Sequence, residues 1–284
     1  MPELRRLWFG GCVMVLVACG QVEKTTGPDI VIEESTITTP AGSEHIQVFV
    51  PGGAFEMGNP DGPDNERPLH EVALDAFYID KYEVTNAQYL AYAEVTGVGK
   101  PQFIREKAFN QPDQPVVGIL WSQARDYCDW AGLKLPSEAQ WEKAASGTDG
   151  RIYPWGNEAT VTQQGNFNFS SGPTAVGSFP EGASPYGAHD MAGNVWEWTL
   201  DEYEHTYYSH SPVTNPINLK NSGLNDGPDR TLRGGGWFSS LQNVRVSVRS
   251  SIYLMDAQYE QNPDMDNVLM FARIGFRCVR NISN

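Results

Sequence analysis

The sequence predicts one large domain of mixed strands and helices in which loops make up much of the chain. Apolar residues alternate over residues 46–50 and 72–80, which is the period of a strand with one buried face. Motifs at 85–88 and 137–140 have the spacing of a capping box, and each predicts the start of a helix. From 153 to 237 glycine, proline, asparagine and aromatic residues dominate without a period, so this region is expected to be mostly loop.

The elements follow one another in an order that local signals define. The first strand enters a glycine turn at 51–53, and the first helix ends at Gly97, a residue suited to the left-handed end position. A second helix is predicted over 121–131, because four residues fall on one face: Ala124, Tyr127, Cys128 and Ala131. A short third helix follows the second capping box. Residues 272–279 are predicted to form a closing strand that returns to the first half of the domain.

Residues 1–18 are predicted to be a bacterial signal peptide that is removed from the mature protein. Two arginines precede an apolar run at 7–17 that is too short to span a bilayer. The run ends in Leu-Val-Ala-Cys at 16–19, which resembles the lipobox of bacterial lipoproteins and implies lipidation of Cys19. An ordinary secretory signal cut near Ala18 is the alternative.

Residues 19–44 are expected to form a flexible tether, and residues 45–281 the folded domain. Gly20 after the cysteine favours the outer membrane, so the expected location is the bacterial cell envelope, facing the periplasm or the cell surface. A formal net charge of −15 argues against nucleic acid and anionic membrane surfaces as partners. The lipid anchor is therefore the expected membrane contact.

The cysteine content predicts one disulfide in the mature domain. Cys12 leaves with the signal peptide and Cys19 carries the lipid, so that Cys128 and Cys278 remain. In an oxidising compartment such a pair predicts a disulfide, and two buried free thiols are the alternative.

Seven segments, taken in order, resemble the formylglycine-generating enzyme family, also called the sulfatase-modifying factor domain. They are VPGGAFEMG, FYIDKYEVTNAQYLAY, QPVVGILWSQARDYCDWAGLKLPSEAQWEKAASG, YPWGNE, YGAHDMAGNVWEWTLD, LRGGGW and IGFRCV. The resemblance covers almost the whole predicted domain. It implies an α+β fold, loop-rich and low in regular secondary structure, related to C-type lectin-like domains. It also implies a disulfide between Cys128 and Cys278, in agreement with the cysteine content.

The segment DMAGNVWEW is the predicted calcium site. Asp190 and Glu197 flank a Gly-Asn turn that can point carboxylates and carbonyls at one centre, as hard cations require, although a plain turn before a strand has the same features. The resemblance implies a structural calcium ion with four ligands: the side chain of Asp190, the carbonyls of Gly193 and Val195, and the side chain of Glu197. It implies a second calcium site at Asn166 and Phe167, but the segment with the later ligands of that site is shortened here.

The segment RGGGW is the predicted ligand pocket. It is no phosphate loop, because the Gly-Lys-Ser/Thr ending and a following helix are missing. The resemblance implies that it leads into an active site where two cysteines bind Cu(I), which with O₂ oxidises a substrate cysteine to formylglycine. Ser239 and Val244 occupy these two positions, and neither holds Cu(I), an ion that prefers thiolates. The copper reaction is therefore expected to be missing from the pocket, whose expected lining is Arg233, Gly234, Gly235, Gly236, Trp237 and Ser239.

Two other groups of side chains are candidate sites. The segment EYEHTYYSH carries two histidines and two glutamates that could bind a metal, although a solvated loop is the favoured interpretation: His205, His210, Glu202 and Glu204. Four arginines near the end of the chain would bind an anion if they faced a pocket, but pairing with the surplus acids is favoured: Arg245, Arg249, Arg273 and Arg277.

Two functions follow from these observations. The first is a non-oxidase binding or accessory protein, anchored by lipid and stabilised by calcium, whose partner is an unknown protein, peptide or glycan. The second is the formylglycine-generating oxidase itself, which the motif order favours and the replaced cysteines oppose. Residues 201–229 and 253–267 are the insertions where recognition is expected.

Overall fold

The computed structural model describes residues 31–159, 163–168, 170–219, 229–252 and 271–282. The helices are α1 (Asn86–Thr96), α2 (Trp121–Trp130) and α3 (Glu138–Ser146). The strands are β1 (Glu34–Thr38), β2 (Glu44–Val50), β3 (Gly53–Met57), β4 (His70–Leu74), β5 (Phe77–Asp80), β6 (Trp196–Glu202), β7 (Arg230–Arg233), β8 (Ile274–Gly275) and β9 (Val279–Asn281). Short 3₁₀ turns are η1 (Asp64–Glu66), η2 (Lys107–Phe109), η3 (Pro180–Gly182), η4 (Tyr207–Ser209) and η5 (Leu241–Val244). The predicted signal peptide, Cys19 and the insertion at 253–267 lie outside the described residues.

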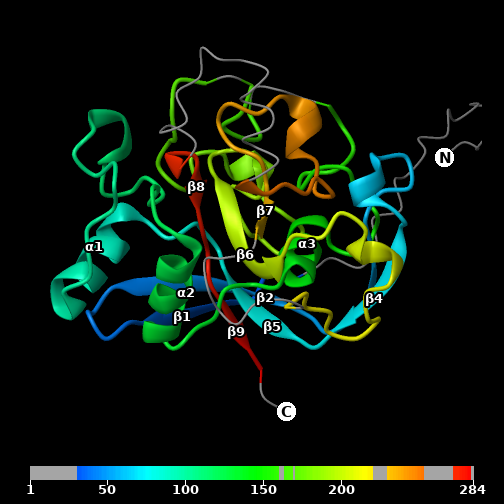
Figure 1. Cartoon of the computed structure of the whole chain (residues 1–284), viewed down its shortest axis with the longest axis horizontal. Helices are drawn as coiled ribbons and strands as arrows, with labels where there is room; N and C mark the ends of the chain where they lie inside the picture. Colours follow the sequence, from blue (N-terminus) through cyan, green and yellow to red (C-terminus); the bar gives the residue numbers. More distant parts are fainter. Residues whose placement is uncertain (1–30, 160–162, 169, 220–228, 253–270, 283–284) are drawn as a thin grey trace, which may run out of the picture.

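A four-stranded antiparallel sheet, in the order β1-β2-β5-β9, carries both ends of the described chain (Figure 1). β1 pairs with β2 from Glu34 opposite Val48 to Thr38 opposite Glu44. The tether predicted over 19–44 is therefore wrong at its C-terminal end, because its last part forms an edge strand of the domain. The segment ESTIT buries little apolar surface, so its pattern does not distinguish it from a tether. Backbone hydrogen bonds to β2 hold it instead.

The single strand predicted over 72–80 is two strands in different sheets. β4 pairs with β3, with Leu74 opposite Gly53, whereas β5 pairs with β2, with Phe77 opposite Val50. The segment from β2 to β3 and the segment from β4 to β5 thus cross from one sheet to the other at the same point. Gly52 permits this, because a Cβ there would lie 3.0 Å from the backbone nitrogen of Ala76.

The helices begin and end where the sequence predicts. Thr85 and Ser137 form capping boxes at the start of α1 and α3, and Gly97 takes the left-handed conformation at the end of α1. The predicted face of α2 is buried, with Tyr127 and Cys128 fully inaccessible to solvent. α3 packs against β3, β4, β6 and β7, so it joins the hairpin to the second sheet.

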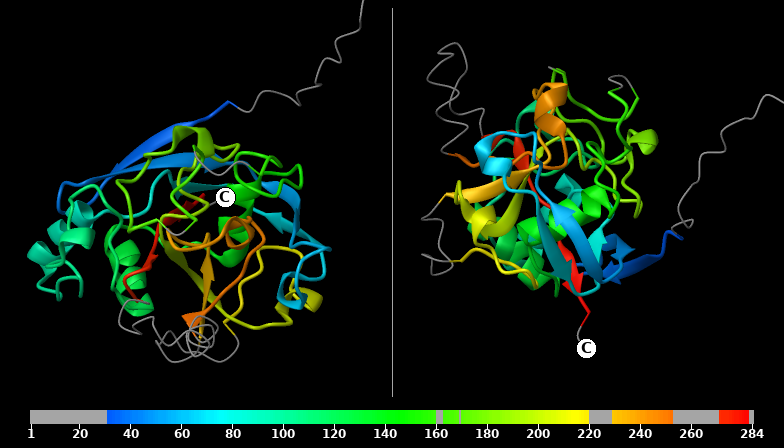
Figure 2. Two further views of the ribbon diagram at one scale, coloured as in Figure 1. Left: turned by 90° about the horizontal axis from the view of Figure 1, so that it is seen from above. Right: turned by 90° about the vertical axis from the view of Figure 1, so that its right-hand side faces the viewer.

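The second sheet, in the order β7-β6-β8, presents the functional segments. β6 is antiparallel to β7 and parallel to β8. Long loops surround this sheet, and between residues 147 and 195 the described chain has one short 3₁₀ turn, η3. In the views of Figures 1 and 2 the segment that carries η5 lies on the side of the domain away from β1. The α+β, loop-rich fold predicted from the sequence is confirmed.

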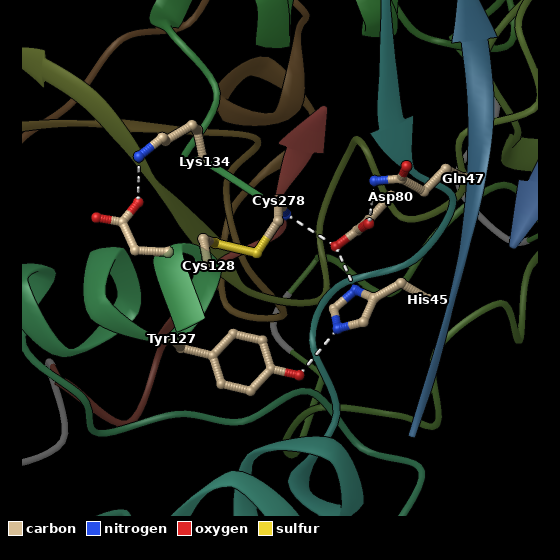
Figure 3. Close-up of a disulfide and its surroundings, with 8 residues drawn as sticks. His45, Gln47, Asp80, Tyr127, Cys128, Lys134 and Cys278 are labelled. Carbon is tan, nitrogen blue, oxygen red and sulfur yellow. Dashed lines mark hydrogen bonds and ion pairs between the residues drawn. A yellow bond between two sulfur atoms is a disulfide. The ribbon is translucent and has the colours of Figure 1, made fainter. Parts of the chain in front are cut away.

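The disulfide between Cys128 of α2 and Cys278 ties the second helix to the C-terminal segment (Figure 3). Cys278 lies between β8 and β9, which replace the single closing strand predicted over 272–279. The carboxylate of Asp80 accepts hydrogen bonds from the Cys278 backbone N–H at 2.9 Å and from Gln47 at 2.9 Å. It also lies 2.8 Å from His45 Nδ1, and the buried ring of His45 reaches the Tyr127 hydroxyl with its other nitrogen. β9 pairs with β5, so the C-terminal segment returns to the first half of the domain as predicted.

Candidate functional site

The glycine loop after β7 packs against the segment predicted to bind calcium. Gly234 and Gly235 have φ values of 92° and 72°, which favour glycine. A Cβ on Gly234 would lie 3.1 Å from the ring of Trp141, and the Gly234 carbonyl accepts the N–H of Gly193 at 2.9 Å. The Trp237 N–H in turn donates to the carbonyl of Asn194 at 2.8 Å. The glycines therefore allow two backbone segments to approach each other closely.

Ser239 and Val244 lie together against Gly235. A Cβ on that glycine would be 3.2 Å from Ser239 Oγ and 2.7 Å from a methyl of Val244. Ser239 Oγ accepts the N–H of Gly236 at 3.0 Å, so it caps the glycine turn. The Val244 side chain is fully buried in an apolar cluster with Tyr153, Phe167 and Ala192. The structure thus brings both predicted positions to one place and fills the second with apolar packing.

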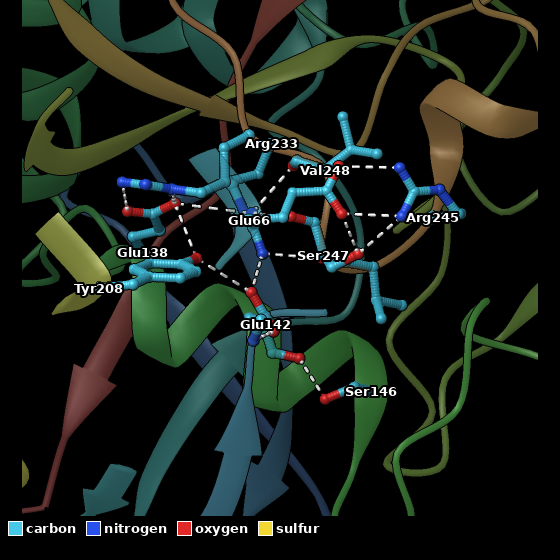
Figure 4. A network of polar contacts seen from close by, with 12 residues as sticks. Glu66, Glu138, Glu142, Ser146, Tyr208, Arg233, Arg245, Ser247 and Val248 are labelled. Atoms are coloured by element: carbon cyan, nitrogen blue, oxygen red, sulfur yellow. Dashed lines mark hydrogen bonds and ion pairs between the residues drawn. The ribbon is translucent and has the colours of Figure 1, made fainter. Parts of the chain in front are cut away.

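Arg233 does not face a ligand pocket, which corrects the predicted lining. Its side chain is fully buried, and its guanidinium binds Glu142 and donates to the carbonyls of Val246 at 2.7 Å and Val248 at 2.9 Å (Figure 4). The sequence pattern could not exclude this, since an arginine before a glycine run can face either a pocket or the core. Arg233 fixes the base of the loop, because it joins β7 to α3 and to the returning chain at 246–248.

Other acids of α3 and η1 bind two of the late arginines. Glu138 accepts from Arg249 at 2.6 and 2.9 Å, and Glu66 accepts from Arg245 at 2.7 and 2.8 Å. Burial alone would raise the pKa of Glu138. The positive charges of Arg249 and Arg233 lower it by more than burial raises it, so the pKa lies below its usual value. The favoured sequence interpretation, that these arginines pair with acids, is confirmed for Arg245 and Arg249.

The loop and strand with the four predicted calcium ligands contain a turn in the left-handed region. Asp190, Gly193 and Asn194 have φ values of 57°, 96° and 56°. Both oxygens of Glu197 accept from Arg277, each at 2.7 Å, and one also accepts from Trp141 at 2.9 Å. The carboxylate of Asp190 accepts the N–H of Gly177 at 2.6 Å. Glu197 would thus share its lone pairs between Arg277 and a cation.

Glu83 is a member of this site that the sequence did not single out. It accepts from the Asn194 side chain at 2.7 Å and from the Val195 N–H at 3.3 Å, and it is buried. Burial, then Asp190 and Glu197, raise its pKa well above the usual value. The carboxylates of Glu83, Asp190 and Glu197 therefore lie close enough to repel one another, and the guanidinium of Arg277 partly offsets this repulsion. The only signal for Glu83 in the sequence is its place within FYIDKYEVTN, part of one of the seven matching segments.

The residues proposed for a second calcium site form protein hydrogen bonds. The Asn166 side chain donates to the carbonyl of Gly172 at 2.9 Å and to the Asn194 side chain at 3.2 Å, and accepts from Ser170 at 2.5 Å. Its backbone carbonyl accepts the N–H of Asn194 at 2.8 Å. Phe167 is buried in the cluster around Val244. These contacts link the segment to the first calcium loop.

Comparison with known proteins decides the family. A model of the sulfatase-modifying factor enzyme 1-like domain, FGE-sulfatase, matches residues 33–282. The chain belongs to this family. The matched range begins one residue before β1, in agreement with the corrected start of the domain.

Relatives of the FGE-sulfatase chain carry several names. The chain is 35% identical to the serine/threonine-protein kinase pkn1 of Chlamydia caviae over 83% of its own length, but spans 38% of that protein. It is 32% identical to the formylglycine-generating enzyme of Streptomyces coelicolor, with 83% of this chain and 89% of the relative covered. It is 31% identical to the inactive C-alpha-formylglycine-generating enzyme 2 of Bos taurus, with 81% and 86% covered. The structure of PvdO from Pseudomonas aeruginosa shares the fold, with a TM-score of 0.69 at 24% identity over 90% of this chain and all of that one.

The copper centre implied by the FGE-sulfatase family does not fit the residues at this site. Ser239 Oγ is a hard oxygen engaged with the Gly236 N–H, and Val244 has no donor atom. Cu(I) prefers soft sulfur ligands. Both cysteines among the described residues, Cys128 and Cys278, form the disulfide, so they cannot replace the missing thiolates.

The histidine-rich segment does not form a metal cluster. His210 Nε2 lies 3.3 Å from Glu204, a contact between two partly exposed side chains. Glu202 is buried, whereas His205 is exposed and lines a surface pocket. No three histidine, cysteine or acidic side chains within the described ranges could hold a metal ion. Over the same ranges, no helix is long and apolar enough to cross a bilayer.

Proposed function

We propose that this chain is a non-oxidase binding or accessory protein of the FGE-sulfatase family, held at the bacterial cell envelope by a lipid on Cys19. The observation that carries the proposal is the pair of residues against Gly235. Ser239 caps the glycine turn and Val244 is packed in an apolar cluster, where Cu(I) would need two thiolates. A relative from Bos taurus that is named as inactive matches over most of its length, which supports a non-oxidase role.

The proposed ligand is a protein, peptide or glycan bound on the side of the domain that carries η5. The residues that follow the glycine turn are half-buried and offer a partly accessible surface: Phe238, Ser239, Ser240 and Leu241. That side lies away from β1, which follows the proposed tether (Figure 2). The described chain therefore begins on the side of the domain away from this surface. The net charge of −15 argues against nucleic acid as the ligand.

The formylglycine-generating oxidase is the alternative, favoured by the 32% identity to the Streptomyces coelicolor enzyme. The test incubates the domain with Cu(I), O₂ and a peptide bearing Cys-x-Pro-x-Arg, and mass spectrometry reports the aldehyde. We expect none above a no-protein control, with the Streptomyces enzyme as positive control. Aldehyde formed by the wild-type domain would overturn the proposal.

A matched variant separates the missing ligands from a missing scaffold. The double substitution Ser239→Cys and Val244→Cys places two thiols at neighbouring positions of the same loop. We expect it to bind Cu(I) in competition with a chromophoric chelator, whereas the wild type does not. Equal copper affinity of the two proteins would mean that these positions are not the determining ones.

Calcium is proposed as a structural ion at Asp190, Gly193, Val195 and Glu197, beside the acid of Glu83. A cation there would offset the repulsion among Asp190, Glu197 and Glu83, which together with burial raises the pKa of Glu83. Calcium should raise the Tm of the wild type relative to chelator, and the Asp190→Ala variant should lose this increment. A Tm that ignores calcium in the wild type would remove the ion from the proposal.

The lipid anchor is tested separately from the domain. Metabolic labelling with a radioactive fatty acid should mark the wild type and not the Cys19→Ser variant. Label retained by that variant would contradict lipidation at Cys19, and an unlabelled wild type would favour an ordinary secretory signal cut near Ala18.

A further inference from the structure

A small polar cavity lies behind η4, away from the glycine loop. Six of its lining residues come from β4, α3, β6 and the chain around η4: His70, Glu138, Asp201, Tyr207, Tyr208 and Ser211. Part of this lining belongs to the insertion at 201–229. The cavity is thus formed where the predicted insertion meets β4, α3 and β6.

Three polar atoms in this lining have neither solvent nor a protein partner. They are Nε2 of His70, the hydroxyl of Tyr207 and Oγ of Ser211, all out of contact with bulk solvent and without a hydrogen bond to any described residue. Buried polar atoms are nearly always paired with protein or ordered water. Three such atoms on residues that line one cavity therefore indicate a shared partner.

The size of the cavity matches one water molecule. The space open to the centre of a water-sized sphere is about 10 Å³. One buried water needs on the order of 10–15 Å³ on this measure, together with two to four polar partners. No larger ligand fits.

The lining also has the right polarity. His70 Nδ1 lies 3.0 Å from the carbonyl of Pro68, which identifies this nitrogen as the donor and leaves the lone pair on Nε2. Burial lowers the pKa of the His70 ring and raises the pKa of the Tyr207 hydroxyl, so the first stays neutral and the second keeps its proton. A water can donate to Nε2 and bond both hydroxyls, which gives about three hydrogen bonds.

A cation is a poorer occupant. Glu138 is bound by Arg249, and the two oxygens of Asp201 accept the N–H groups of Asn218 and Glu138, each at 2.8 Å. The nearby carboxylates are therefore already engaged. The unpaired atoms are one imidazole nitrogen and two neutral hydroxyls, a set suited to water.

We propose that this cavity is the binding site of a single internal water molecule, which joins His70 of β4 to Tyr207 and Ser211 and so fastens η4 to the core. A surface pocket of about 620 Å³ is lined by Ser209 of η4 and by His205 and Thr206 just before it. Arg67, Pro68 and Leu69 also line this pocket. The water thereby fixes a wall of that pocket. The inference is independent of the proposed binding role.

A crystal structure of the wild-type domain, at a resolution that shows ordered water, tests the site directly. We expect a water peak at about 2.7–3.2 Å from His70 Nε2, Tyr207 Oη and Ser211 Oγ. An empty cavity, a metal peak, or side chains turned so that the three atoms bond to protein would overturn the proposal.

Oxygen-17 relaxation dispersion in solution counts water molecules held inside a protein for long times. The double variant Tyr207→Phe, Ser211→Ala should lose one such water. The Ser209→Ala variant removes a hydroxyl of the same turn on its outer side and should keep it. Equal counts in all three proteins would overturn the proposal. The crystal structure decides the question even where the double variant does not fold.

Discussion

Replacing Glu138 by glutamine should destabilise the domain by about 3–5 kcal/mol, the range for breaking a buried ion pair by removing one partner. The Glu138 side chain is 2% exposed, and it accepts two hydrogen bonds from Arg249, which is fully buried. Nη1 of Arg233 lies 3.5 Å from Oε1 of Glu138. Glutamine has the same shape, but it leaves the guanidinium of Arg249 in the interior without its counter-charge. The upper half of the range is expected, because both partners are inaccessible to water.

The loss should also depend on pH. Arg249 and Arg233 hold the pKa of Glu138 below its usual value in the folded state. The stabilising contribution is therefore fully present above the unfolded pKa of about 4.3 and is lost as the pH falls through the folded value. The difference in stability between wild type and Glu138→Gln should be largest near neutral pH and should shrink in acid.

Guanidinium chloride unfolding followed by tryptophan fluorescence measures the loss, and Asp129→Asn is the matched control. Asp129 pairs with Lys134 at 2.9 Å on the surface, where the two side chains are 43% and 64% exposed, so its removal should cost about 0–1 kcal/mol. In thermal unfolding the loss at Glu138 corresponds to about 6–20 °C for a domain of this size. A Glu138→Gln midpoint no lower than that of Asp129→Asn, with an unchanged denaturant slope, would refute the reasoning.

Three further changes test other parts of the structure. Gly235→Ala should lower the free energy of unfolding more than Gly42→Ala. Both glycines have positive φ, at about +72° and +80°, but only at Gly235 would the Cβ lie 2.7 Å from a carbonyl oxygen. Equal losses of stability in denaturant would contradict this contact. Joint replacement of Cys128 and Cys278 by alanine should cost about 2–5 kcal/mol in unfolding free energy, since their crosslink closes a loop with a separation of 150 residues; stability equal to that of the unreduced wild type would contradict the crosslink. Burial raises the pKa of Asp201 from 3.8 to about 7, so the stability of the wild type should fall as the pH rises from about 4 to 7. Asp201→Asn should flatten this fall. An unchanged pH profile would assign the fall to another group.

Local signals in the sequence were sufficient for the helices. The capping boxes at Thr85 and Ser137 involve residues three apart, so neither needs information from the rest of the chain. The buried face of α2, with Cys128, follows from helical spacing in the same way. The neighbouring positions of Ser239 and Val244 came from the family resemblance rather than from a local pattern.

Long-range pairing was not readable from the sequence. Glu138 and Arg249 are 111 residues apart, and no periodicity specifies that these two meet. The same limit explains Arg233, which was expected in a pocket and lies in the core. It also explains Glu83, which contacts Asn194 of the predicted calcium segment across a separation of 111 residues. The strand β1 was missed for another reason, since backbone pairing rather than apolar side chains determines it.

The pairing of β9 with β5 sets the order in which the chain can fold during synthesis. β5 is complete at Asp80, yet its second edge and half of the disulfide are supplied by residues 278–281, at the end of the described chain. Until these residues emerge, β5 exposes a strand edge with the apolar side chains of Phe77 and Ile79, a template for wrong pairing. The domain therefore closes last at its own C-terminus, and a chain that stops before Cys278 loses its crosslink and its edge strand together.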